Sequence, residues 1–190
     1  MKKIIKSMSN KYMQKSLELV ERVFTEFEDK EGGILNRELV KEIRSKKYYL
    51  PELELIMVNE ENDEIIGYAM FSAFHLEGRY SDILLMLTPV AVKTELQRQH
   101  ISKELIEHGF QKAIELGYKA VIVEGNPQNY RSRGFKTSSD YGIVAGDSID
   151  LPAPECLMVK ELVPNTLDTI HGKAEYTDYA TISLGGAYNE

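Results

Sequence analysis

Apolar residues recur along this chain with two different periods, which predict a mixture of helices and strands. From Met13 to Phe27 they return every three or four residues, the spacing of one face of a helix. After Gly32 and Gly33 break this pattern, a second helix is expected from an Asn36 cap to Lys46. The helical period returns from about Gln97 to Leu116, and Gly117 is placed to end that helix.

Shorter apolar runs predict the strands. Leu53–Val58 and Ile65–Phe74 flank a polar turn, so they are expected to pair as an antiparallel hairpin. Ile83–Leu87 and Ala120–Val123 are almost continuously apolar, as strands buried on both faces are. The helix between these two runs predicts parallel pairing through a right-handed crossover. Further strands are expected at Ile4–Ile5, from Phe135 and at Glu155–Leu162.

These elements predict a mixed α/β (α+β) fold with a central sheet of about six to seven strands flanked by helices. One domain is expected over residues 1–164. A polar extension, residues 165–190, would pack on this domain or trail from it. Because chemistry collects at the carboxyl ends of parallel strands, residues 92–102 and 124–130 are expected at the same edge of the sheet.

Composition narrows the classes of partner. The net charge of −7 argues against nucleic-acid binding, which needs a basic face. It mildly favours cationic small molecules or peptides, although an acidic surface also serves solubility alone. Four scattered histidines lack ligand spacing, so no metal site is expected.

Cysteine usage and hydropathy bear on the compartment. The single cysteine, Cys156, excludes an internal disulfide and fits a reducing, cytoplasmic setting, where it would be a small buried apolar residue. The first residues lack the apolar core of a secretory signal. No run approaches the roughly 18 apolar residues of a membrane span, so no membrane partner is expected.

The most informative stretch is residues 89–103, PVAVKTELQRQHISK, where a strand passes through a polar turn into a helix. The first turn of a helix presents backbone N–H groups without intrahelical acceptors, and the helix dipole adds positive charge there. This arrangement predicts an anion site suited to a diphosphate. The turn carries His100 and Ser102, however, where glycines usually let a backbone approach phosphate.

Three segments in order resemble the GNAT (Gcn5-related) N-acetyltransferases, especially bacterial members with a PVAV strand end before the cofactor turn. The first segment is Pro89–Val92. The second is the turn Gln97–Ser102, which matches the position of the family motif Q/R-x-x-G-x-G/A, and the third is Tyr130–Phe135, which matches the motif Y-x-x-x-G-F. The resemblance covers essentially the whole chain. It implies the GNAT fold and an acetyl-CoA-dependent enzyme that acetylates a primary amine of a small molecule or peptide by direct attack on the thioester.

The resemblance also implies roles for the residues around the turn. The main chain of Val90, Ala91 and Val92 would hold the pantetheine arm like an added strand. The diphosphate would lie on the turn formed by Gln97, Arg98, Gln99, His100, Ile101, Ser102 and Lys103. Arg98 and Lys103 would add charge there, although each singly also fits a solvated helix start.

His100 leaves three outcomes open. CoA binds normally with the side chain turned outward, CoA binds weakly, or the site serves another purpose. If His100 needs positive φ, the cost is on the order of 1 kcal/mol or more. Ser102 is a smaller departure, because its hydroxyl is able to donate to a phosphate oxygen.

Tyr130 is the candidate catalytic acid, since a tyrosine stays protonated at neutral pH and is able to donate to the departing thiolate. A half-buried structural tyrosine is the competing interpretation. Glu124, at the end of the strand before it, is the candidate base, with Asp82 as a second candidate. A surface carboxylate or a water chain remains an alternative for the base.

Two other functions stay open. The loss of both loop glycines fits a non-catalytic acyl-CoA-binding or sensing module on the same fold. An unrelated strand–helix–strand protein would use the turn for another phosphate ligand. The acceptor and the oligomeric state are not readable from the residues, although homodimers are common among proteins of this family.

Overall fold

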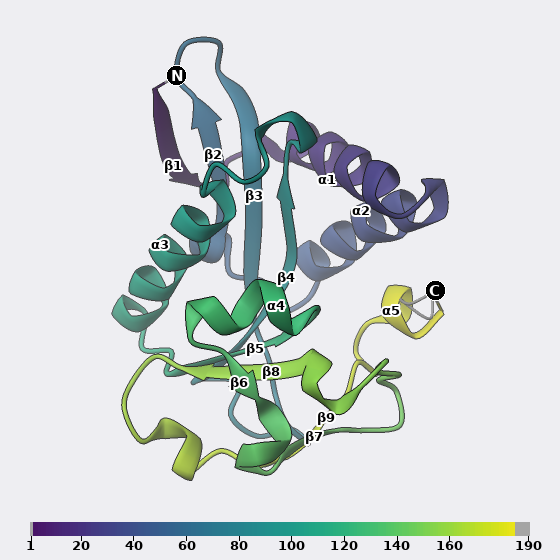
Figure 1. Cartoon of the computed structure of the whole chain (residues 1–190), viewed down its shortest axis with the longest axis vertical. Helices are drawn as coiled ribbons and strands as arrows, with labels where there is room; N and C mark the ends of the chain where they lie inside the picture. The colour runs from purple at the N-terminus through teal and green to yellow at the C-terminus, as the bar shows by residue number, and fades with distance from the viewer. Residues whose placement is uncertain (1, 185–190) are drawn as a thin grey trace. The chain divides into compact units, whose positions relative to one another are not determined.

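The computed structural model of this protein describes residues 2–184. Its helices are α1 (Met13–Phe27), α2 (Lys30–Ser45), α3 (Ile101–Glu115), α4 (Pro127–Tyr130) and α5 (Ala180–Leu184) (Figure 1). Its strands are β1 (Lys3–Ser7), β2 (Glu54–Asn59), β3 (Glu64–Ala73), β4 (Leu84–Val92), β5 (Ala120–Glu124), β6 (Lys136–Thr137), β7 (Ile143–Ala145), β8 (Leu157–Glu161) and β9 (Gly172–Ala174). None of the described helices has the length and apolar character needed to cross a membrane.

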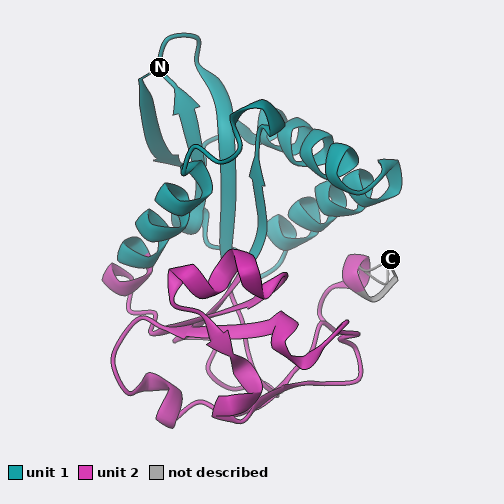
Figure 2. Ribbon diagram, viewed as in Figure 1, with its two compact units in different colours: residues 1–72, 88–112 teal, residues 73–87, 113–190 magenta. Residues whose placement is uncertain are grey.

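Seven of these strands form one mixed sheet in the order β1-β2-β3-β4-β5-β8-β6, and β7 pairs with β9 in a second sheet. The predicted fold class, a mixed sheet of six to seven strands flanked by helices, is confirmed. The chain divides into two compact units, coloured separately in Figure 2. Unit 1 comprises residues 1–72 and 88–112, and unit 2 comprises residues 73–87 and 113–190.

In unit 1, β3 is buried along nearly its whole length because helices cover both of its faces. Gly67 lies against Ile101 and Leu105 of α3, and an added Cβ would stand 2.5 Å from the Ile101 side chain. The next residue, Tyr68, points to the other face and donates to Glu54 at 2.6 Å. The predicted hairpin is confirmed, since β2 and β3 pair antiparallel.

A buried carboxylate joins the elements on that second face. Glu54 is fully buried, and its oxygens accept from Tyr49 at 2.5 Å, from Tyr68, and from Arg44 of α2 at 2.5 Å. Arg44 also donates to the Ser16 hydroxyl of α1 at 2.7 Å. Burial raises the pKa of Tyr68 well above its usual value, with the Glu54 charge adding to the rise. A charge held in this way fastens both helices to the sheet, because losing one partner would leave it desolvated and unpaired.

The second helix begins six residues before the predicted Asn36 cap. Asp29 caps it by accepting from the Gly32 N–H at 2.8 Å, so both glycines lie inside the helix. Gly33 is needed there because an added Cβ would stand 1.9 Å from the Thr25 hydroxyl of α1. Gly33 thus marks a close approach of α2 to α1, and neither glycine breaks the helix. α1 itself has the predicted bounds.

Unit 2 contains the predicted parallel pair. Leu84, Leu85 and Met86 of β4 are in register with Ala120, Val121 and Ile122 of β5, which confirms the parallel pairing. On its other edge β5 pairs antiparallel with β8. Gly117 has φ +93° and follows α3, as the sequence predicts for a terminating glycine.

The polar extension predicted from residue 165 contributes buried side chains to unit 2. Ile170, Ala174, Tyr176 and Tyr179 are all nearly inaccessible to solvent. β9 pairs parallel with β7, and neither three-residue strand was predicted because so short a run shows no period. Residues 185–190 of the extension lie outside the described residues.

Candidate active site

The last residues of β4 present a strand edge. β4 stays paired with β3 to its end, where the Lys93 N–H donates to the Ile66 carbonyl at 3.1 Å. Its register with β5 comprises the three pairs from Leu84 to Met86, and within the described residues no strand is registered with that edge of Val90–Val92. An extended ligand that carries amide groups is able to add to such an edge by main-chain hydrogen bonds.

The turn after β4 adopts two left-handed backbone conformations. Arg98 has φ +62° and His100 has φ +64°, so α3 begins at Ile101 and not near the predicted Gln97. The His100 carbonyl accepts from the Glu104 N–H at 2.9 Å, which makes His100 the residue flanking the helix start. His100 therefore has the backbone geometry for which a glycine is best suited, and its side chain is exposed.

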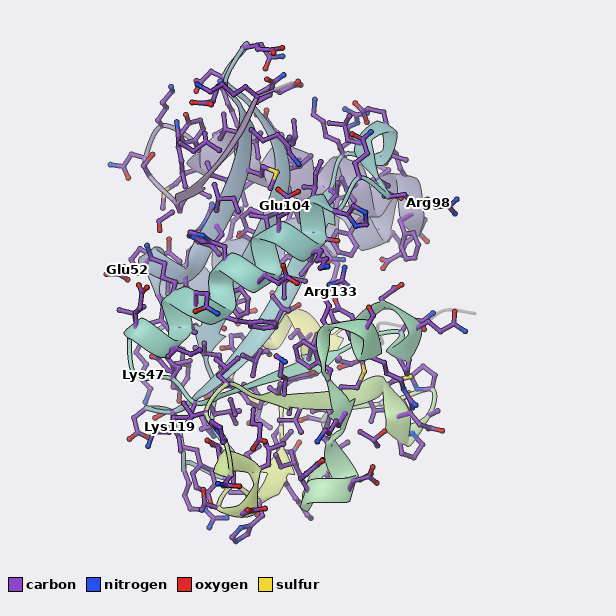
Figure 3. The ribbon with its side chains drawn as sticks, turned by 60° about the vertical axis from the view of Figure 1, so that its left-hand side comes forward. Lys47, Glu52, Arg98, Glu104, Lys119 and Arg133 are labelled. Atoms are coloured by element: carbon purple, nitrogen blue, oxygen red, sulfur yellow. The ribbon has the colours of Figure 1, made fainter. Side chains whose placement is uncertain are left out.

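The backbone geometry of this turn is suited to binding an anion. The first N–H groups of α3, from Ile101 onward, precede any intrahelical acceptor and lie at the positive end of the helix dipole. Turns with left-handed residues aim successive N–H groups into a concavity that suits anions. Arg98 and Lys103 are exposed cations beside it, and Figure 3 shows the Arg98 side chain extending outward from the turn.

The contacts that hold the turn in place were not predicted from the sequence. Lys93 is nearly buried and binds Glu64 at the start of β3, and that ammonium lowers the pKa of the Glu64 carboxyl. Glu95 accepts from Arg22 of α1 at 3.1 Å. Thr94 donates to Glu26, also on α1. These partners lie far apart in the chain, so local patterning reads Lys93–Glu95 only as a polar turn.

Two glycines, one on β3 and one on α3, let α3 pack closely against β3. Gly67 of β3 admits Ile101 and Leu105, the first apolar residues of the helix. Gly109 of α3 lies against the Phe71 ring, where an added Cβ would stand 2.2 Å from a ring carbon. Gly67 therefore sets how closely the start of α3, and with it the candidate anion site, lies to β3.

In unit 2, Tyr130 ends the short helix α4. Asn126 caps this helix by accepting from the Gln128 N–H at 2.9 Å. The Tyr130 ring packs over Gly125, makes an edge contact with Phe135 at 5.6 Å, and lies 5.9 Å from the Arg133 guanidinium. Burial raises the pKa of Tyr130, and the Arg133 charge lowers it by less. The hydroxyl is therefore a proton donor at neutral pH.

Glu124 directly precedes Gly125 at the end of β5 and is half-buried. Its carboxylate accepts from the Tyr176 hydroxyl at 2.7 Å. In unit 2 the predicted acid and the predicted base therefore both lie next to Gly125. Asp82, the second candidate base, is exposed and precedes β4, at the opposite end of the β4–β5 pair.

Sequence reasoning missed Tyr176, and it also missed a hydrogen bond between His75 and Asp178. His75 accepts from the Gly78 N–H at its Nδ1 atom, so its Nε2 atom carries the proton and donates to Asp178 at 2.7 Å. No group of His, Cys, Asp or Glu side chains suited to a metal ion occurs among residues 2–184.

Known proteins share this fold. The model of the acetyltransferase (GNAT) family matches residues 18–137. YhbS of Escherichia coli strain K12, described as an uncharacterized N-acetyltransferase, is 26% identical over 125 residues, which are 65% of this chain and 72% of its own.

Two solved structures extend the likeness to nearly the whole chain. YhbS from Escherichia coli in complex with CoA has a TM-score of 0.81 at 21% identity, over 96% of this chain and 92% of that one. A GNAT family acetyltransferase from Brucella melitensis in complex with acetyl-CoA has a TM-score of 0.69 at 20% identity, over 95% and 97%.

Proposed function

The chain belongs to the acetyltransferase (GNAT) family, and on this premise we propose that it moves the acetyl group of acetyl-CoA to a primary amine of a small molecule or peptide. The observation that carries the proposal is the left-handed turn at His100, which precedes α3 and follows a strand with no registered partner, among the described residues, on one edge of Val90–Val92. One continuous segment then offers amide-pairing groups followed by an anion site. Acyl-CoA has a matching order of groups, with amides in the pantetheine arm and then a diphosphate.

In this proposal unit 1 binds the cosubstrate. The main chain of Val90, Ala91 and Val92 pairs with the pantetheine amides. The diphosphate rests on the turn of Gln97, Arg98, Gln99, His100, Ile101, Ser102 and Lys103, with the exposed charges of Arg98 and Lys103 beside it. No metal ion is required, because the acceptor attacks a thioester that is already activated.

Glu124 and Tyr130 would handle the protons. The ammonium form of the acceptor gives one proton to Glu124 and becomes a nucleophile. Its nitrogen attacks the thioester carbon, the C–N bond forms, and the C–S bond breaks as Tyr130 donates its proton to the thiolate. The second amine proton restores the tyrosine through solvent. One ammonium and one acetyl-CoA therefore yield one amide, one CoA thiol and one released proton, with no covalent enzyme intermediate.

A non-catalytic acyl-CoA-binding module is the second candidate, and one observation favours it. His100 has the left-handed conformation and yet carries a Cβ beside the anion site, a position that a well-adapted phosphate turn gives to glycine. A module that binds acyl-CoA only to sense it would tolerate weaker diphosphate contacts than an enzyme that turns over.

Calorimetry with acetyl-CoA, followed by a thiol-release assay on a panel of primary amines, separates the two. Binding with turnover of at least one amine supports the acetyltransferase. Binding with no turnover over a broad panel supports the sensor, and absence of binding contradicts both. The cytoplasm is the compartment we propose, which localisation of the tagged protein in cells would test.

A further inference from the structure

Glu124 has a partner from a distant part of the chain, and this contact points to a role for the C-terminal segment. Tyr176 and Glu124 both belong to unit 2, and the Tyr176 hydroxyl donates to Glu124 Oε2 at 2.7 Å. Tyr176 is 6% exposed, so solvent competes little for this hydrogen bond. A charge-assisted hydrogen bond of this kind is stronger than one between neutral groups.

Two further contacts fix where the hydroxyl points. The Tyr176 ring makes an edge contact with Phe74, with centroids 6.3 Å apart and planes at 64°. Its backbone N–H donates to the Ser148 hydroxyl at 2.8 Å. Ser148 is held in turn by Glu175, which accepts from the Ser148 N–H at 2.9 Å. Contacts of both the ring and the backbone of Tyr176 therefore fix the position from which its hydroxyl donates to Glu124.

The chemistry of the contact defines what it does. A hydroxyl donor favours the ionised form of a carboxylate and occupies one of its lone pairs. It also holds the carboxyl group in one orientation, so that the remaining lone pairs keep a fixed direction. A carboxylate that must accept a proton from an ammonium group needs both properties.

We infer that Tyr176 is a positioning residue for catalysis, which acts by holding Glu124 ionised and oriented to accept the proton of the acceptor amine. The inference rests on the proposed acetyltransferase function and adds to it a part for the segment after β9. Tyr176 touches neither substrate nor cofactor in this scheme. Its effect must therefore disappear when Glu124 is no longer able to accept a proton.

A double-mutant cycle tests this dependence. The variants are Tyr176→Phe, which keeps the ring that packs on Phe74, Glu124→Gln, and the two combined. Tyr12→Phe is the matched control, because the Tyr12 hydroxyl donates to Asp63 at 2.6 Å in unit 1, outside the proposed machinery. Each variant is measured for acetyl-CoA affinity by calorimetry and for kcat by thiol release, with an amine that the unmodified protein acetylates.

Tyr176→Phe is expected to lower kcat about tenfold, the effect of one hydrogen bond to a charged group, with acetyl-CoA affinity unchanged. Glu124→Gln is expected to lower kcat about a hundredfold or more. The kcat of the double variant should equal that of Glu124→Gln, because Tyr176 then has no carboxylate to orient. Tyr12→Phe should keep full activity.

Several results would overturn the inference. Multiplicative effects in the double variant would assign Tyr176 a purely structural role, and full activity of Glu124→Gln would remove its target while leaving acetyl transfer intact. Binding of acetyl-CoA without turnover of any amine would overturn the enzyme proposal and the inference together. Should Tyr176→Phe fail to fold, Ser148→Ala replaces it, because it removes the hydroxyl that accepts from the Tyr176 N–H and donates to Glu175, and it leaves the Tyr176 side chain unchanged. A fall in kcat that vanishes in combination with Glu124→Gln supports the inference, and a multiplicative one contradicts it.

Discussion

Replacing His100 by glycine tests the backbone conformation on which the proposed cofactor site depends. His100 has φ +64°, where the Cβ of an L-residue costs roughly 1–2 kcal/mol; histidine tolerates this region better than most residues, so we use the lower end. Glycine escapes this cost but loses roughly 0.5–1 kcal/mol through its greater freedom in the unfolded chain. The net difference between histidine and glycine therefore favours glycine by at most about 0.5 kcal/mol.

His100→Ala is the matched control, because it removes the imidazole and keeps the Cβ. We expect His100→Gly to be more stable than His100→Ala by about 0.5–1 kcal/mol, which raises the melting temperature by about 1–4 °C in a chain of this size. Because the imidazole is exposed, acetyl-CoA affinity should hold or improve in His100→Gly. Thermal melts of the free protein and calorimetry with acetyl-CoA measure the two effects.

Two results would refute this reasoning. Equal stability of the glycine and alanine variants would show that residue 100 bears no left-handed strain in solution. A large loss of acetyl-CoA affinity in both variants would make the imidazole a ligand of the cofactor, contrary to its assignment as a tolerated side chain.

Four other changes have expected outcomes. Tyr130→Phe should lower turnover in the thiol-release assay about a hundredfold with little change in acetyl-CoA affinity, and an unchanged rate would remove it from the mechanism. Gly67→Ala should weaken acetyl-CoA binding measurably by calorimetry, because its Cβ would displace the first turn of α3; unchanged affinity would show that the helix start is not set there. Arg44→Ala should destabilise the protein by about 3–5 kcal/mol in urea unfolding, because Glu54 would remain buried without its cation, and a loss below about 1 kcal/mol would contradict this. The lowered pKa of Glu64 stabilises the fold above its unfolded value of 4.5, so stability should fall as pH drops below that value; the fall should be smaller in Glu64→Gln, as acid titrations followed by circular dichroism will show.

Local pattern predicted much of the fold because most elements are long enough to show a period. α1 has the predicted bounds, and the β2–β3 hairpin and the parallel β4–β5 pair are confirmed. The prediction of a helix break at Gly32 and Gly33 was wrong, because contact with Thr25 of α1 requires a glycine at position 33 inside a helix. That requirement comes from a neighbour in space, which no local window contains.

The candidate site also contains a part that was predictable from the sequence and a part that was not. The strand, turn and helix around His100 are contiguous, so a sequence pattern was able to propose them together. Lys93 reaches Glu64 across 29 residues and Tyr176 reaches Glu124 across 52, so these partners carry no signal in the sequence near either residue. The roles of Val90–Lys103, Glu124 and Tyr130 remain predictions until the variants are assayed.

The hydrogen bond between Tyr176 and Glu124 also bears on the order in which the protein is completed during synthesis. Every residue of unit 1 has left the ribosome once Lys112 has, so its sheet and helices are able to pack while unit 2 is still being made. β5 and Glu124 follow soon after, but Tyr176 arrives 52 residues later. A nascent chain would therefore acquire its proposed cofactor turn before the partner of its proposed base, which delays full activity until the segment after β9 has been made.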